Sequence, residues 1–141
     1  MKNKLPYKLK YKGKFLCWIL GLFFPASKRM DNIYMAFGKI VFVPAGVLRV
    51  PQDMLVHELT HLHQQNFNYF KAILWWIRYV FSKRFRYAQE LEAYHTQFHF
   101  LCKFVRDRNK RVEIKKTFAS ILSGPLYNNA SSFWQAYNDL G

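Results

Sequence analysis

The chain has 141 residues, enough for a hydrophobic core of its own, and we expect residues 1–141 to form a single domain. Hydrophobic residues make up 51% of the sequence and aromatic residues 19%, which excludes a disordered chain, and the two cysteines exclude a zinc site of four thiolates. The 22 Lys and Arg residues against 8 Asp and Glu residues give a net charge of +14, which could attract an anionic partner, either nucleic acid or an acidic membrane surface.

Residues 1–30 form a basic and apolar N-terminal segment. Lysines alternate with other residues before the apolar run Phe15 to Phe24, a pattern similar to a secretory signal peptide. The run is shorter than the roughly 20 residues that span a bilayer, and no small-x-small cleavage site follows it. We expect a short helix that packs on the domain or lies on a membrane surface. This favours a cytoplasmic or peripherally membrane-associated protein, with a cleaved signal peptide as the alternative.

A hairpin and a helix are predicted next. The apolar and β-branched segment Ile33 to Val43 has Gly38-Lys39 in its middle, which predicts a β-hairpin with a two-residue loop. Pro51 and Asp53 then predict the start of a helix that contains MLVHELTHLHQQ.

The rest of the chain reads as helices. Residues 68–81 are apolar nearly all round and predict a buried helix, with a membrane-dipping hairpin as the alternative. A long helix is expected over 87–105, and the basic stretch 106–116 predicts a solvated turn and the start of another helix. Ser132, with Gln135 three residues later, is typical of the cap of a last helix. The fold class is therefore α+β and mainly α, with a hairpin or small sheet packed on the helix that carries the histidines.

The strongest motif is His57-Glu58-Leu59-Thr60-His61. Residues four apart on a helix lie about 40° apart around its axis, so both imidazoles point to one side and can share a metal ion. Glu58 can reach a water in the open position of that ion and act as the general base. Gln64, one turn beyond His61, could orient a ligand. These residues predict one Zn²⁺ per chain and a metal-activated water that attacks a polarised carbonyl.

A catalytic zinc needs a third protein ligand, which the helix from residue 87 can supply. On a helical wheel, Glu90 lies on the apolar side, whereas Glu92 lies on the side of His95 and His99. A carboxylate that faces a core is costly unless it is paired or binds a metal, so Glu90 is the predicted ligand, with Glu92 as the alternative. A salt bridge between Glu90 and Arg86 would be the structural explanation.

The string HELTHLHQQ, followed by ELEAY at 90–94, resembles the gluzincin branch of the zinc metallopeptidases. It is also similar to small bacterial and phage proteins with an HExxHxxQ helix. The resemblance covers roughly residues 33–99, with a weaker echo in LSGPLY at 122–127, and implies a minimal zincin-like domain. In gluzincins the first glutamate of an ExxAD string is the third ligand, which corresponds to Glu90. Tyr94 replaces the Asp that orients a ligating histidine in that string.

The same resemblance implies hydrolysis of a peptide or protein substrate. It also implies that a strand edge near the cleft binds an extended peptide, and that a tyrosine or histidine stabilises the oxyanion. Tyr127, Tyr94 and His95 are the candidates for that catalytic role.

Two other interpretations remain open. The first is a non-catalytic zincin-like basic platform that binds nucleic acid, membrane or a virion component, which the basic stretch 103–116 favours. The second is a di-metal helical protein, because Glu58-x-x-His61 and Glu92-x-x-His95 each match the unit found in di-iron bundles. The sequence does not indicate an oligomeric state.

Overall fold

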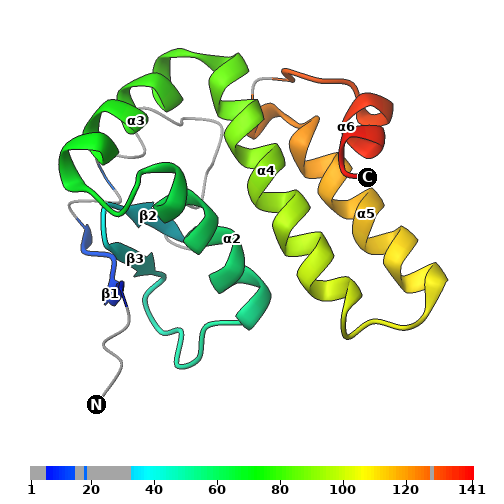
Figure 1. Cartoon of the computed structure of the whole chain (residues 1–141), viewed down its shortest axis with the longest axis horizontal. Coiled ribbons are helices and arrows are strands. Elements are labelled where there is room, and N and C mark those ends of the chain that lie inside the picture. The colour runs from blue at the N-terminus through cyan, green and yellow to red at the C-terminus, as the bar shows by residue number, and fades with distance from the viewer. Residues whose placement is uncertain (1–5, 15–17, 19–32, 128) are drawn as a thin grey trace.

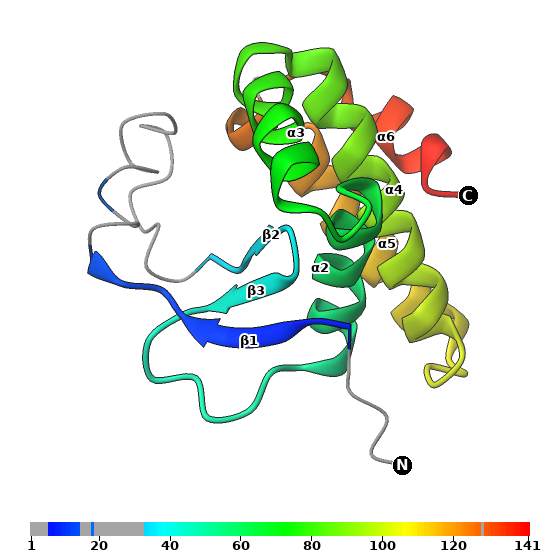
Figure 2. The same ribbon diagram turned by 60° about the vertical axis from the view of Figure 1, so that its left-hand side comes forward.

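The computed structural model describes residues 6–14, 18, 33–127 and 129–141. The described part is mainly helical with one small sheet, as the sequence predicts. Figure 1 shows the sheet, helix α2, helix α4 and helix α5 following one another across the molecule, and Figure 2 shows the sheet against α2 with α4 and α5 behind. The helix expected at Phe15 to Phe24 lies almost wholly outside the described residues. In the described part, no helix combines the length and apolar character that a bilayer span requires.

The sheet has three strands in the order β1-β3-β2, namely β1 (Lys8–Tyr11), β2 (Met35–Phe37) and β3 (Ile40–Val43). Strands β2 and β3 form the predicted hairpin, with Phe37 opposite Ile40 and Gly38 at a φ of 61° in the loop. Strand β1 pairs parallel to β3 and was not predicted, because its alternating lysines read as part of the basic N-terminal segment. All four of its residues are exposed.

Helix α2 (Gln52–Gln64) follows Pro51, where the sequence predicts a helix start. It packs on the hairpin through a small core of Ala36, Val41 and Leu62. The fully buried Gln65, just past the helix end, accepts a hydrogen bond from the Gly38 amide at 2.7 Å and donates one to the Ala36 carbonyl at 3.1 Å. These bonds hold the end of α2 against the hairpin.

Helices α3 (Tyr69–Phe81) and α4 (Lys83–Cys102) follow without a long loop. Asn68 caps α3, and Ser82 caps α4, so that α4 begins four residues before its predicted start at 87. The prediction that the helix at 68–81 is buried is wrong. Only Ala72, Trp75 and Tyr79 are buried there, because α3 packs on the domain with one face only. When nearly every position of a helix is apolar, the sequence pattern cannot indicate which side packs on the core.

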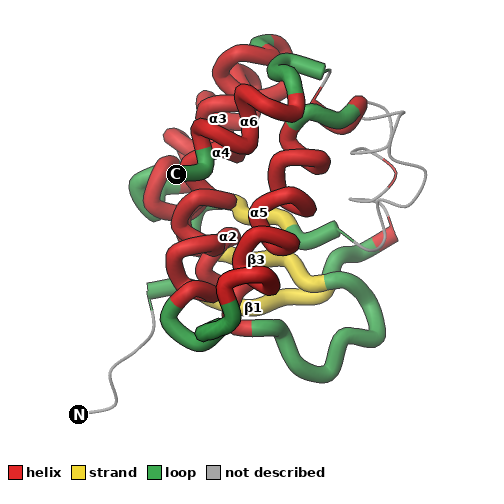
Figure 3. The backbone as a smooth tube through the Cα atoms, turned by 90° about the vertical axis from the view of Figure 1, so that its right-hand side faces the viewer, coloured by secondary structure: helices red, strands yellow, loops and turns green. Residues whose placement is uncertain are grey.

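The C-terminal part consists of α5 (Arg108–Leu122), the short 3₁₀ helix η2 (Pro125–Tyr127) and α6 (Phe133–Asp139). Asp107 caps α5, and Ser132 caps α6 as predicted. The basic stretch 106–116 is therefore mostly helix, and its turn ends at Asp107. Figure 1 shows α5 and α6 on the side of the molecule away from the strands, and Figure 3 looks onto that side, where they share a second core with α4.

Candidate metal centre

Two buried histidines and one buried glutamate come together between α2 and α4. His57 and His61 are each 5% exposed and Glu90 is 4% exposed. The Nε2 atom of His57 lies 3.4 Å from Oε2 of Glu90, and Nε2 of His61 lies 3.4 Å from Oε1. One ligand atom from each residue lies within 4.8 Å of the others, so the three side chains could hold a metal ion. The predicted convergence of these residues is confirmed.

The packing of α2 on α4 explains why these side chains meet. The two histidine rings are one turn apart on α2, with centroids 5.0 Å apart and planes at 80°. Ala93, one turn after Glu90, is fully buried, and its small side chain lets the helices approach closely. This close approach brings a carboxylate of one helix to two imidazoles of the other.

The outer nitrogen of each imidazole is held by a glutamine. Nδ1 of His61 lies 2.8 Å from Oε1 of Gln64, and Nδ1 of His57 lies 3.1 Å from Oε1 of Gln97. Because an amide oxygen only accepts, each Nδ1 carries a proton, and Nε2 is the atom of each ring that faces the Glu90 carboxylate. Gln64 is the residue that the sequence predicts for this role.

Gln97 was missed, although the same wheel that selects Glu90 places it on the buried side of α4. Its Nε2 donates to Oδ2 of Asp53 at 2.9 Å, which turns its oxygen toward His57. In the ExxAD string the residue that orients a ligating histidine is four positions after the glutamate, where this chain has Tyr94. Tyr94 instead packs edge-on against the His57 ring, with centroids 4.5 Å apart, and Gln97 accepts the hydrogen bond.

Two tyrosines fix the Glu90 carboxylate. Tyr79 donates a short hydrogen bond to Oε1, and Tyr127 donates one to Oε2 at 3.0 Å. Burial and the charge of Glu90 raise the pKa of both hydroxyls well above their usual value, so both stay protonated donors. Tyr79 was not predicted as a site residue. Tyr127, one of the predicted oxyanion candidates, contacts the candidate ligand Glu90.

The charges of the three groups are coupled. Burial alone would raise the pKa of Glu90, but His61 and hydrogen bonds from both histidines hold it well below its usual value. Burial lowers the pKa of His61, yet the charge and hydrogen bond of Glu90 raise it to about 9. In the metal-free protein the carboxylate therefore keeps a proton on His61, and a divalent cation bound there would displace that proton.

Glu58 lies in the same cavity as the three candidate ligands, as expected for a general base. Burial raises its pKa, and the positive charge of His57 and of His61 opposes that rise. A carboxylate with a raised pKa is a stronger base than an exposed one.

The cavity has a volume of about 270 Å³ and opens between the segment before β2, α2, α3 and η2. Its walls are largely apolar, with Met35, Met54, Trp75, Trp76 and Leu126 among the lining residues. The lining also includes the three candidate ligands, Glu58 and the buried Lys12.

The other predicted residues lie elsewhere. Glu92 is exposed and accepts a hydrogen bond from Gln64 at 3.0 Å, so it lies behind that glutamine and not among the ligands. His95 faces a separate surface depression, where its Nε2 is 3.1 Å from that of His99. The prediction of His95 as an oxyanion donor is therefore wrong. The same placement removes support for the di-metal interpretation, which needs Glu92 and His95 at the site.

Arg86 is buried and donates to the carbonyl oxygens of Tyr79 and Val80, at 2.9 and 2.8 Å. It therefore fastens the corner between α3 and α4. A salt bridge to Arg86 therefore does not by itself explain the burial of Glu90, because its carboxylate contacts two imidazoles and two hydroxyls.

Comparisons with protein-family models, with curated proteins and with solved structures gave no match for this chain. The function is therefore argued from the geometry of the site.

Proposed function

We propose that the protein is a zinc-dependent peptidase in which His57, His61 and Glu90 hold one Zn²⁺ and Glu58 is the general base. The observation that carries this proposal is the buried His57, His61 and Glu90 group, with a second buried acid, Glu58, in the same cavity. Uncompensated burial of that many ionisable groups is costly, and a site that binds a cation offsets the cost.

The donor set fits zinc. Two neutral imidazoles and one carboxylate are a common ligand set of catalytic zinc sites, whereas Ca²⁺ and Mg²⁺ prefer sites made of oxygen atoms. The same three donors also hold Fe²⁺ in some oxygenases. The presence of Glu58 favours a hydrolase over an oxygenase, because a buried carboxylate beside the ligands can act as the base in peptide hydrolysis.

Zinc bound at this site would supply a Lewis acid that polarises a carbonyl and lowers the pKa of water. Glu58 accepts the proton of the attacking water, and its raised pKa suits it to hold that proton. The proton then passes to the amine of the leaving peptide as the C–N bond breaks. Gln64 and Gln97 keep both imidazoles oriented throughout, and Tyr79 and Tyr127 keep the Glu90 carboxylate in place.

The test pairs metal analysis with one substitution. We expect one zinc per chain after purification and cleavage of an unstructured protein. Glu58→Gln should keep the zinc and lower the cleavage rate by about 100-fold or more. Glu113→Gln, which removes an exposed carboxylate on α5, is the matched control and should change neither quantity.

Two results would overturn the proposal. Cleavage that survives Glu58→Gln with zinc bound would leave Glu58 without a catalytic role and would favour the non-catalytic platform. Iron in place of zinc, with no hydrolysis of any unstructured protein, would favour oxygen chemistry instead.

A further inference from the structure

Helix α3 has one buried face and one exposed face. Its inner face packs on the domain with Ala72, Trp75 and Tyr79, and the last two of these also line the cavity. Its outer face carries large apolar side chains that are about half exposed or more. These are Phe70 (69% exposed), Ile73 (49%), Leu74 (48%), Ile77 (51%) and Phe81 (80%).

These five side chains form one stripe, here called the α3 stripe. At 100° per residue they fall within a sector of about 100° around the helix axis, and that sector contains no charged residue. The helix rises about 20 Å over its 13 residues, so the α3 stripe runs along three turns. A continuous apolar surface of this length marks a site of interaction with another surface.

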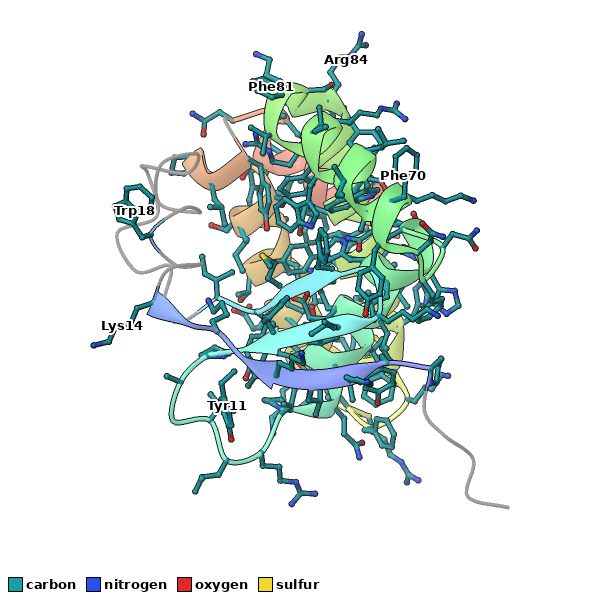
Figure 4. All side chains as sticks on the ribbon, turned by 90° about the vertical axis from the view of Figure 1, so that its left-hand side faces the viewer. Tyr11, Lys14, Trp18, Phe70, Phe81 and Arg84 are labelled. Atoms are coloured by element: carbon teal, nitrogen blue, oxygen red, sulfur yellow. The ribbon has the colours of Figure 1, made fainter. Side chains whose placement is uncertain are left out.

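The surroundings of the α3 stripe are positively charged. Residues 59–89 contain no Asp or Glu. Lys71 and Arg78 on α3, and Lys83 and Arg84 at the start of α4, are all exposed. Figure 4 shows Phe81 and Arg84 projecting from the same end of the molecule, with Phe70 farther along α3.

The charge pattern selects the kind of partner. A second copy of the chain, docked stripe to stripe about a two-fold axis, would bring these cations close to their own counterparts, and neither α3 nor the first turn of α4 carries an acid to neutralise them. An acidic lipid surface offers an apolar layer for the stripe and anionic headgroups for the cations beside it.

We propose that α3 lies in the interface of an acidic bilayer, with the α3 stripe in the acyl boundary and Lys71, Arg78, Lys83 and Arg84 at the headgroups. This inference goes beyond the proposed function and does not depend on it. Because the inner face of α3 lines the cavity, the candidate metal centre would lie about one helix diameter, roughly 10 Å, from the membrane surface.

The test is co-sedimentation of the full chain with vesicles of phosphatidylcholine that contain about 30% phosphatidylserine, at low and at physiological salt. The double variant Phe70→Ser/Ile77→Ser should weaken binding about tenfold or more. The matched control is Phe104→Ser/Trp134→Ser, which removes two side chains that are at least as exposed on average, 68% and 69%, from other parts of the molecule. It should bind as the unchanged protein does.

A second pair of variants tests the charge. Lys83→Gln/Arg84→Gln should weaken binding more than Arg108→Gln/Lys110→Gln, which removes the same charge from exposed positions on α5. Helical circular dichroism checks that each variant is folded, so a loss of binding is not a loss of fold.

Three outcomes would overturn the inference. Equal binding by the stripe variant and its control would assign membrane binding to other surfaces. Equal binding to vesicles with and without phosphatidylserine would remove the role of the cations. A dimer in sedimentation equilibrium that the stripe variant abolishes, with no vesicle binding, would make the α3 stripe an interface between copies of the chain.

Discussion

Nε2 of His61 lies 3.4 Å from Oε1 of Glu90, in a site where both side chains are almost completely buried. Without a cation, this contact is an ion pair that forms only when His61 is protonated. With a cation between them, the same two atoms are separate ligands. The contact therefore links proton binding, metal binding and folding, and most of the predictions below follow from it.

Glu90→Gln should abolish tight zinc binding. The substitution replaces the charged carboxylate with a neutral amide, whose oxygen is a weak metal ligand. We therefore expect zinc affinity to fall by about 100-fold or more. Competition with a chelator at neutral pH measures it. The control is Glu92→Gln, which lies two residues further along α4 on its exposed side and should lower zinc affinity far less. An equal loss of affinity in the two variants would contradict the assignment of Glu90 as a ligand.

Gln97→Leu should lower zinc affinity about 10- to 100-fold while His57 remains in place. The reason is that Gln97 accepts the Nδ1 proton of His57 and so fixes the orientation of the ring. Thr96→Leu, at an exposed neighbouring position, is the control and should bind zinc as the unchanged protein does. Unaltered affinity in Gln97→Leu would show that the hydrogen bond has no influence on the metal.

Tyr127→Phe separates two roles of one hydroxyl. A group that positions Glu90 should affect zinc affinity, and activity should return at saturating zinc, whereas an oxyanion donor should affect kcat with zinc fully bound. We expect the first result, with affinity about tenfold lower, because the hydroxyl already donates to Glu90. A large fall in kcat at saturating zinc would instead support the oxyanion role that the family resemblance implies.

The stability of the metal-free protein should fall as the pH rises through about 9. The pKa of His61 is raised from 6.5 to about 9, so its protonation stabilises the folded state fully below pH 6.5 and ceases to do so above pH 9. Urea unfolding at pH 6 and pH 9.5 measures the difference, and His61→Phe should remove most of it. For the same reason, zinc affinity should rise about tenfold per pH unit below pH 9. An affinity independent of pH in that range would contradict the coupling.

Gly38→Ala should destabilise the fold by about 1 to 3 kcal/mol. Gly38 has a φ of 61°, and a Cβ at this position would collide with the ring of Tyr69. Urea unfolding measures the change, with Gly46→Ala as the comparison. Gly46 also has a positive φ, of 82°, but a Cβ there has no neighbour within 4 Å. A smaller loss in Gly38→Ala than in Gly46→Ala would contradict the proposed role of the contact.

The sequence predicts the site better than it predicts the surfaces. His57 and His61 could be paired because helical spacing alone places them on one side, and Glu90 could be chosen because the wheel puts a costly carboxylate on an apolar face. The glutamine that orients His57 could have been found by the same wheel, but an amide carries no charge to draw attention to it.

The outer face of α3 could not be predicted in the same way. A segment that is apolar at nearly every position has no polar residues to mark the exposed side, and only the packing of α3 on α4 and the hairpin decides which residues face out. Strand β1 escaped prediction for a related reason, since its lysines alternate with Leu9 and Tyr11 and its pairing with β3 depends on distant residues.

The most direct test is a crystal structure of the zinc-loaded protein with anomalous data at the zinc edge. The account predicts one peak, about 2.0 to 2.2 Å from Nε2 of His57, Nε2 of His61 and a carboxylate oxygen of Glu90. A peak at His95 and His99, or a fully loaded crystal in which Glu90 is not a ligand, would contradict it.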